Sequence, residues 1–475
     1  MKKSALCPTL LRLSERVSSS DFREDAITFF EGSGFLLLLA ALTLLGHIFS
    51  LDGITMCLML LVSSLAVRIT HSILQGVPSL LIFIFQMSVR NAPSIPSFSD
   101  YYFSGWRAFL LPAFLLIFAF SLFYTFFTKR EWNVQSLKSL PDIKTALPLA
   151  LAFLLNGAFS GEWCASSLVF GLLQIVSFFL IGYFFYLGFF GISSKKIINY
   201  FALTASVIAA VLVIETLWLY VAGEVVTDGV ADKGRVLYGW GIWTTAGMDM
   251  AVLIPLVFLG ASRSAKPWIY LTIAHLTYAS AVLTLSRNAL VFATAALVAS
   301  AIFYILRARH GKRLFKIYAA VLCVAVLLLP IYSSRLLSLL SDYLERGFSD
   351  NGRLTLWRYG LDRFLEAPIF GKGFFAIEPD TFRAQNFFPP MLHNTAVQLS
   401  ASMGIFGLVS YIIYRVSMLR GLLRPKNSDT VYLLLSILTL LFMSLLDNFV
   451  FYIQPMFLFS VEYALIHSVK REHAR

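Results

Sequence analysis

Charged residues are scarce in this sequence. Asp, Glu, Lys and Arg make up only 13% of its 475 residues, while 58% of the residues are hydrophobic. Soluble globular domains carry about 25% charged residues, so the composition excludes an ordinary soluble enzyme. Apolar runs long enough to cross a bilayer recur along the whole chain instead. We therefore expect a polytopic helical membrane protein.

Cysteine and acidic side chains are scarce as well. The chain has four cysteines, and none of them has the spacing of metal ligands, so no disulfide framework, metal site or cofactor is expected. Lys and Arg outnumber Asp and Glu by 38 to 26. In a soluble protein this excess would suggest nucleic acid, whereas the cytoplasmic loops of membrane proteins carry surplus basic residues in any case. No nucleic-acid partner is expected.

The apolar runs predict an all-α fold with about twelve to fourteen transmembrane helices. Two of these runs, 54–67 and 146–160, are short for a bilayer about 30 Å thick, so they could be re-entrant or displaced. The candidate spans are 34–50, 54–67, 72–89, 108–127, 146–160, 167–189, 198–223, 241–260, 267–284, 288–306, 315–333, 394–415, 430–450 and 453–468.

These runs predict a domain organisation around one long loop. Threading alternate connections to opposite sides places most basic residues on the side of the N-terminus, so the positive-inside rule predicts cytoplasmic termini and a long loop outside the plasma membrane. The first apolar run begins only near Gly34, after a basic stretch, which is typical of an uncleaved anchor. The predicted parts are a cytoplasmic tail over 1–33, a transmembrane bundle over 34–333, a large extracytoplasmic loop with short helices over 334–393, transmembrane helices over 394–468 and a second cytoplasmic tail over 469–475.

The predicted loop over 334–393 is the only long polar segment of the chain. Connections of this length are uncommon, so we expect the loop to carry binding or chemistry. Its basic residues are Arg335, Arg346, Arg353, Arg358, Arg363, Lys372 and Arg383, and it ends at His393-Asn394.

A helix is predicted inside this loop, from about Arg353 to Glu366, with Asp350 or Asn351 as its cap. We expect its apolar face to lie on the bundle or on lipid head groups. Arg358 falls on the same face, where it could bind an anion or pair with Asp362 four residues further on. The apolar residues of this face are Leu354, Trp357, Leu361, Phe364 and Leu365.

Ionisable residues also occur in and between the predicted spans. Arg287 occupies a tight joint between two apolar helices, either as a snorkelling side chain or as an anion ligand at the outer mouth of the bundle. Arg235 lies in the preceding outer connection, either as an ordinary loop charge or as a further ligand. Glu215, Asp249 and Glu462 could be functional acids or could form hydrogen bonds between helices, and we assign them no role.

Several arginines and one histidine on an outer face indicate phosphate chemistry. Arginine presents a planar fork of donors that suits phosphate oxygens and can offset the charge of a departing pyrophosphate. Histidine titrates near neutrality and can take a proton from an attacking hydroxyl. Together these side chains fit glycosyl transfer from a lipid pyrophosphate donor to an acceptor hydroxyl.

Five short motifs follow one another over roughly 235–415. They are Ser286-Arg287, Gly352-Arg353 with Trp357, Pro368-Ile369-Phe370-Gly371-Lys372-Gly373, His393-Asn394 and Gly404-Ile405-Phe406-Gly407. This region resembles the O-antigen ligase and polymerase family, in which a histidine and a small polar residue precede a spaced glycine pair after a large outer loop. The segment around Arg235 departs from the family pattern, which tends to include a Pro-Asn pair there.

The resemblance implies a metal-independent, inverting glycosyltransferase. By motif position, His393 would be the general base, and Arg287 and Arg353 would bind the pyrophosphate with help from Arg235. Asn394 would orient His393 or cap the following helix. Arg358 is our further candidate for the pyrophosphate site, and the glycines of the last motif are expected to let helices pack closely.

The resemblance also implies the partners. We expect an undecaprenyl-pyrophosphate-linked glycan as donor, a glycan, lipid or protein as acceptor, and surrounding membrane lipids. Ligase and polymerase activities both fit these residues. The alternative from another class is a flippase or transporter of lipid-linked sugars, although transporters usually show internal repeats and none is visible here.

Overall fold

The chain is described here by a computed structural model, which confirms the predicted all-α class. Strands are limited, in the described part, to two hairpins of two-residue strands, β1 (Val226–Thr227) with β2 (Val230–Ala231) and β3 (Leu237–Tyr238) with β4 (Gly241–Ile242). The structure describes residues 20–49, 51–87, 105–129, 137, 140–222, 225–227, 230–231, 237–238, 241–321, 323–324, 352–376, 389–423 and 428–474.

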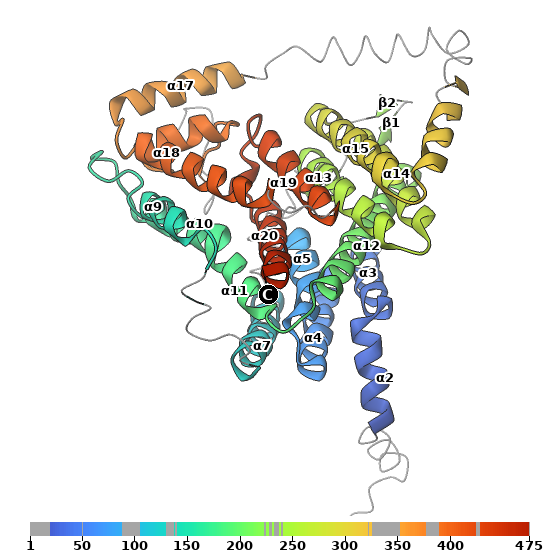
Figure 1. Ribbon diagram of the computed structural model, residues 1–475. Helices are drawn as coiled ribbons and strands as arrows, with labels where there is room; N and C mark the ends of the chain where they lie inside the picture. The colour runs from blue at the N-terminus through green and yellow to red at the C-terminus, as the bar shows by residue number, and fades with distance from the viewer. Residues whose placement is uncertain are drawn as a thin grey trace, which may run out of the picture.

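Helices account for most of the described residues (Figure 1). The first half contributes α2 (Ser20–Glu31), α3 (Ser33–Ile48), α4 (Asp52–Thr70), η1 (Ile73–Gln75), α5 (Gly76–Met87), α7 (Arg107–Thr128), α9 (Ile143–Leu154), α10 (Ala165–Ile175), η2 (Val176–Leu180), α11 (Ile181–Gly188) and α12 (Ser194–Val221). The second half contributes α13 (Trp243–Arg263), α14 (Pro267–Leu283), α15 (Arg287–Arg307), α17 (Arg353–Glu366), α18 (Thr395–Leu423), α19 (Ser428–Met443), η4 (Phe449–Phe451) and α20 (Ile453–Ala474).

Fewer helices are long enough to span a membrane than the apolar runs predict. Among the described residues, seven helices have the length and composition of a span, or eight if the bent pair Arg23–Glu31 and Ser33–Ile48 counts as one. The number of spans expected from the sequence is higher because some apolar runs form helices that are too short to cross a bilayer. Examples are α5, α9 and α19. The run at 54–67 is a full helix of 19 residues, so it is not short, whereas the run at 146–160 ends early at Leu154. Most of the predicted span 315–333 lies outside the described residues.

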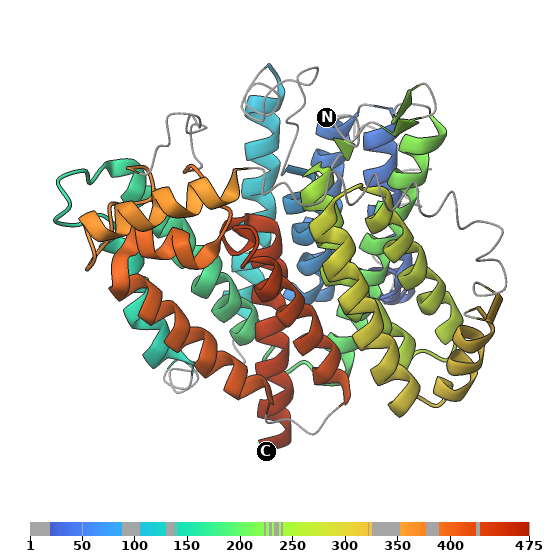
Figure 2. The ribbon, with the colours of Figure 1, turned by 90° about the horizontal axis from the view of Figure 1, so that it is seen from above.

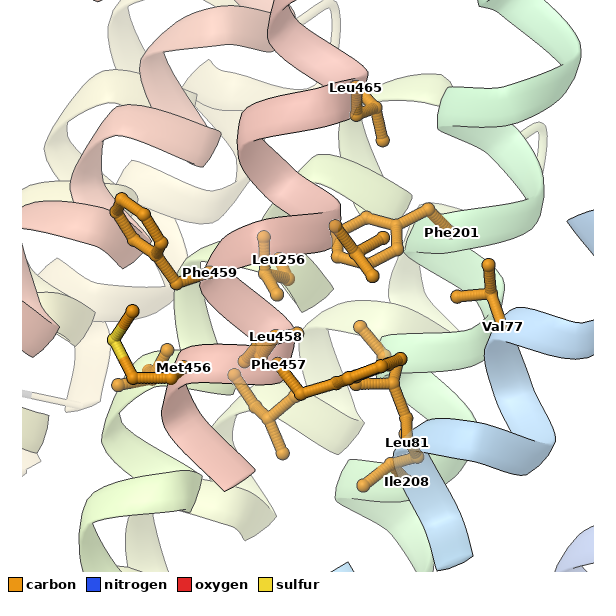
Figure 3. Packing of buried hydrophobic residues seen from close by; sticks show 14 of the residues in the cluster. Val77, Leu81, Phe201, Ile208, Leu256, Met456, Phe457, Leu458, Phe459 and Leu465 are labelled. Carbon is orange, nitrogen blue, oxygen red and sulfur yellow. The ribbon is translucent and has the colours of Figure 1, made fainter. Parts of the chain in front are cut away.

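The centre of the bundle is α13. Every residue from Thr245 to Ala261 is buried, because α12, α14, α15 and α19 surround this helix. Beside it, Phe457 and Leu458 of α20 pack with Leu81 of α5 and Phe201 of α12 (Figure 3). The interior is therefore apolar over several layers, as expected for helices that bury one face and expose another to lipid.

Ion pairs mark one end of the bundle, which we call the terminal end. There Lys196 at the start of α12 pairs with Glu31 at 2.7 Å, and Arg263 at the end of α13 pairs with Asp429 at the start of α19. The side chain of Glu472, near the end of α20, accepts a hydrogen bond from the backbone of Ser194 at 2.8 Å. The ends of these helices thus fix which connections share a side of the molecule.

A second group of helices, α9, α10, α17 and α18, lies to one side of α20 (Figures 1 and 2). The loop helix α17 packs along α18, as both views show. Its bounds, Arg353 to Glu366, are those predicted from the sequence. The glycine-rich turn over 368–373 then enters a break in α18.

That break is at Gly404, whose φ of 65° and ψ of −164° interrupt the helix. The amides of Ile405 and Phe406, which lose their helical partners there, donate to the carbonyls of Pro368 (2.8 Å) and Ile369 (3.2 Å). On the other side of the break, the carbonyl of Ala401 accepts from the Lys372 amide at 2.8 Å. Turn and broken helix therefore satisfy one another's backbone groups, as an apolar environment requires.

Glycine is required at the break for two reasons. The backbone at Gly404 is left-handed, and a Cβ there would lie 2.3 Å from the carbonyl oxygen of Ile369. The residue does allow a close approach, but of a turn rather than of the second helix that we expected. Gly371 faces the same problem from the other side, because its φ is 68° and a Cβ on it would lie 2.3 Å from the carbonyl carbon of Ser402.

We predict that Gly404→Ala destabilises the protein by at least about 2 kcal/mol, because it adds left-handed strain and a backbone overlap. The matched control is Gly421→Ala on the same helix, where a Cβ would meet only the flexible end of Lys470 and the ring of His467. Thermal unfolding of the purified variants checks this. Equal melting temperatures for the two variants would show that the break does not depend on glycine.

Candidate functional site

The ring of His393 is held by a carboxylate. His393 directly precedes the cap of α18 and has a left-handed φ of 51°. Its Nδ1 lies 2.9 Å from Oδ1 of Asp447, which follows α19 in the chain. A carboxylate can only accept, so Nδ1 is the donor, and in a neutral imidazole held this way the lone pair is on Nε2. The side chain of His393 is 31% exposed while that of Asp447 is 9% exposed, so the histidine faces solvent and its partner lies behind it.

Arg353 approaches the same carboxylate from the loop helix. Its Nη2 lies 4.0 Å from Oδ2 of Asp447, and its side chain is 27% exposed. Asp447 thus joins two of the predicted site residues that are far apart in the chain. Asp447 is not among the residues expected from the sequence, because 430–450 is predicted there as one apolar span. The available signal was an acidic residue near the C-terminal end of that span.

A buried amide network holds the backbone around this pair. Oε1 of Gln398 accepts from the backbone of Leu392 at 2.8 Å and from Nδ2 of Asn448 at 2.9 Å. Leu392 directly precedes His393, and Asn448 directly follows Asp447. Gln398 therefore fixes both neighbours and supports the left-handed backbone of His393, which would otherwise cost about 1–3 kcal/mol.

Asn394 takes one of the two roles left open for it. Its Oδ1 accepts from the backbone of Val397 at 3.1 Å, so it caps α18. An asparagine at this position stabilises the helix that follows the histidine.

Arg287 lies at the same end of the bundle as this pair. It is the first residue of α15, which Ser286 caps by accepting from the Ala289 amide at 3.4 Å. Near the start of α13, a Cβ at Gly247 would touch the Cβ of Ala289, so α13 and α15 begin at one end. The other end of α13 pairs with the start of α19, as described above. The start of α15 and the exit of α19 toward Asp447 therefore share the end opposite the terminal end.

The two remaining candidates differ in whether the structure describes them. Arg235 lies outside the described residues. Arg358 is on α17 but is exposed. The cap of α17 is Gly352, with a φ of 78° and no side-chain hydrogen bond, while Asp350 and Asn351 lie outside the described residues.

The apolar face predicted for α17 does not lie on the bundle, so contact with lipid head groups stays the prediction for it. The helix buries Leu356 and Gly360, whereas Leu354, Leu361 and Leu365 are exposed. Gly360 decides the face, because a Cβ there would lie 2.5 Å from a methyl group of Val397 and 2.6 Å from one of Leu392. Only the side of α17 that carries this glycine can approach α18.

Lys372 of the loop forms ion pairs with two carboxylates. Its Nζ lies 2.7 Å from Glu162 at the tip between α9 and α10 and 3.0 Å from Glu366 at the end of α17. The hydrogen bond to Glu162 raises the pKa of Lys372, and the hydrogen bond from Lys372 lowers the pKa of Glu366. These charges fasten the loop to the bundle and leave Lys372 engaged with protein.

The intramembrane acid Glu462 has a structural contact. Its Oε1 lies 2.6 Å from Oγ of Ser436, which donates to the carbonyl of Val252 at 2.9 Å. This chain of contacts joins α20, α19 and α13. It fits hydrogen bonding between helices, one of the two interpretations considered for this residue.

Three buried polar atoms on the segments that carry Arg353, His393 and Asp447 have no hydrogen-bond partner in the described part of the chain. They are Oγ1 of Thr395, Oδ1 of Asn448 and Nε1 of Trp357, which lies one turn after Arg353 on α17. An orphaned buried polar atom costs about 1–3 kcal/mol. Each of the three segments that carry Arg353, His393 and Asp447 thus also has one buried donor or acceptor without a hydrogen-bond partner.

No three His, Cys, Asp or Glu side chains are grouped as metal ligands within the described residues. The contacts at this site join one imidazole, one buried carboxylate and the guanidinium of Arg353.

Comparison with known proteins assigns this region to a family. Residues 272–412 match the family model described as O-Antigen ligase. The match includes Arg287, Arg353 and His393, while Asp447 lies beyond it. No curated protein matches the chain.

We predict that Thr395→Val raises the melting temperature of the unliganded protein, because it replaces a buried, unpartnered hydroxyl with a methyl group of similar size. The gain should be about 1 kcal/mol. The matched control is Thr439→Val on α19. The hydroxyl of Thr439 donates to the Leu435 carbonyl at 2.8 Å, so its removal loses a hydrogen bond and should lower the melting temperature. A lower melting temperature for Thr395→Val than for wild type would show that its hydroxyl is already satisfied.

Proposed function

We propose that this chain, whose residues 272–412 form an O-antigen ligase domain, transfers a glycan from an undecaprenyl-pyrophosphate carrier to an acceptor hydroxyl. The observation that supports this most is the contact of His393 with the buried Asp447, with Arg353 beside the same carboxylate. That arrangement supplies a base and a cation in one partly exposed place. Both are needed when a hydroxyl displaces a pyrophosphate.

In the proposed reaction, Nε2 of His393 takes the proton of the acceptor hydroxyl. The hydroxyl oxygen attacks the anomeric carbon of the donor sugar as the bond from that carbon to the pyrophosphate oxygen breaks. The electron pair leaves with the pyrophosphate, and attack from the opposite face inverts the anomeric centre. Asp447 holds the imidazole in the required tautomer and stabilises the imidazolium that forms.

The arginines bind the leaving group in this scheme. Arg353 and Arg287 contact the pyrophosphate oxygens and offset the charge that develops on them. At 4.0 Å from Asp447, Arg353 is not locked into a short ion pair, so it can turn toward a phosphate. Arg235 and the exposed Arg358 would add positive charge at the rim. In this scheme the arginines do the work that a metal ion does elsewhere.

We place the reaction on the outer face of the plasma membrane. The excess of basic residues on the side of the termini supports this orientation. Ligase and polymerase activities use the same chemistry at these residues and differ in the acceptor. We favour a ligase acting on a glycan, lipid or protein hydroxyl.

We predict that His393→Ala and Asp447→Asn each lower kcat for glycan transfer by about 10²–10⁴-fold while the protein stays folded. The control is His310→Ala, because His310 lies just after α15, near the terminal end. Transfer from a defined lipid-linked donor is measured by product analysis.

Wild-type rates for both variants would contradict the enzymatic assignment. Movement of lipid-linked sugar across vesicles by the purified protein, without a new glycosidic bond, would point to a flippase instead.

We also predict that EDTA leaves the transfer rate unchanged, because arginine side chains take the place of a divalent cation at the pyrophosphate. The measurement compares initial rates before and after chelation. A loss of activity that Mg²⁺ restores would show that the arginines are not sufficient.

A further inference from the structure

Arg415 is a buried arginine that has no charged partner among the described residues. It lies inside α18 and is only 5% exposed. Its Nε and Nη2 have no hydrogen-bond partner in the described part of the chain. Nη1 contacts the sulfur of Met418 at 3.8 Å. An isolated buried charge of this kind costs several kcal/mol.

Aromatic rings surround this guanidinium. Its central carbon lies 4.6 Å from the ring centre of Phe459, 5.0 Å from those of Phe178 and Tyr411, and 5.6 Å from that of Tyr414. Such rings stabilise a cation through their negative faces. They offer no lone pairs to the N–H groups, however, so the donors of the guanidinium stay available to an oxygen anion in its plane.

The helix opposite Arg415 is irregular at the same level. Phe178 belongs to η2, a π-helical turn between α10 and α11. The carbonyl of Ser177 there accepts from Ser460 at 2.8 Å, and that of Phe178 accepts from Tyr414 at 3.5 Å. π-Helical turns occur frequently at functional sites. Arg415 and this turn therefore mark one place in the bundle, independently of the His393 site.

The nearby acid on this side is engaged by other groups. Oδ1 of Asp142 accepts from Ser417 at 2.7 Å, and its Oδ2 lies 3.2 Å from the hydroxyl of Tyr463. No ion pair joins Asp142 to Arg415 among the described residues.

This part of α18 lies toward the terminal end of the bundle. Arg415 is eight residues, or about 12 Å, before the last residue of α18. At that end Lys470 of α20 reaches the carbonyl of Gly421, and Arg420 is exposed. Basic residues near a membrane surface attract anionic lipid head groups. Anionic lipid head groups are therefore expected at this end of α18, within about 12 Å of Arg415.

We propose that Arg415 is the anchor of a second anion site, which binds a phosphate group carried by an anionic lipid at the terminal end. The rings of the cage hold the guanidinium in place, and its Nε and Nη2 donate to two phosphate oxygens. The site is separate from the His393 site and does not depend on the proposed transferase activity. Its occupant would join α18 to α20 and η2, whose rings surround the guanidinium.

The test measures how ligands shift the melting temperature of delipidated, full-length protein in neutral detergent. Phosphatidylglycerol, phosphatidylcholine and inorganic pyrophosphate are titrated separately into wild type, Arg415→Gln and Arg420→Gln. The last variant is the matched control, since it removes the same charge from an exposed position of the same helix. We expect phosphatidylglycerol to stabilise wild type and Arg420→Gln, with at least about tenfold weaker binding to Arg415→Gln.

Equal phosphatidylglycerol titrations for wild type and Arg415→Gln would overturn the proposal, and so would an absence of any response in wild type. If only pyrophosphate raises the melting temperature, and only when Arg415 is present, the ligand is a free phosphate and the proposal that a lipid supplies it is wrong. If Arg415→Gln does not fold, Arg415→Lys serves instead. It keeps the charge but loses the fork, so it should bind phosphatidylglycerol more weakly than wild type, and equal binding would count against the proposal.

Discussion

The constraint on which the structure depends is that every backbone polar group within the bundle must find a partner. In α18 this is met in an unusual way, because the helix breaks at Gly404 and the turn over 368–373 supplies the missing partners. That exchange holds the loop against the bundle. As a result α17 lies along α18 with Arg353 beside Asp447, and the loop reaches His393 from a fixed direction.

Charged groups add a second layer to this arrangement. Lys372 joins the tip between α9 and α10 to the end of α17 through two carboxylates, so the loop is tied to the bundle at three places: the break, this ion pair and the Asp447 carboxylate. Only the last contact is loose. The structure therefore combines a firmly held segment over 352–373 with a loosely paired Arg353, an arrangement that suits the proposed binding and release of a charged leaving group.

Much of this could be predicted from the sequence. Hydropathy and the scarcity of charge predict the helical membrane class, and apolar spacing with turn residues predicts α17 with its observed bounds. The packing face of α17 could not be predicted, because it depends on how closely Gly360 approaches Leu392 and Val397, a tertiary contact. Asp447 could not be predicted for a similar reason. Its contact with His393 forms only because the segment after α19 packs against the start of α18 in the folded protein. The burial of Arg415 could not be predicted either, because it depends on the rings of η2 and α20 that pack around the guanidinium.

The most direct test of the account is a structure of the protein with a non-hydrolysable polyprenyl-pyrophosphate glycan bound. The account predicts the pyrophosphate between Arg287 and Arg353, with Nε2 of His393 facing the anomeric carbon from the side opposite the leaving oxygen. A donor bound at the other end of the bundle, or a pyrophosphate far from both arginines, would contradict it.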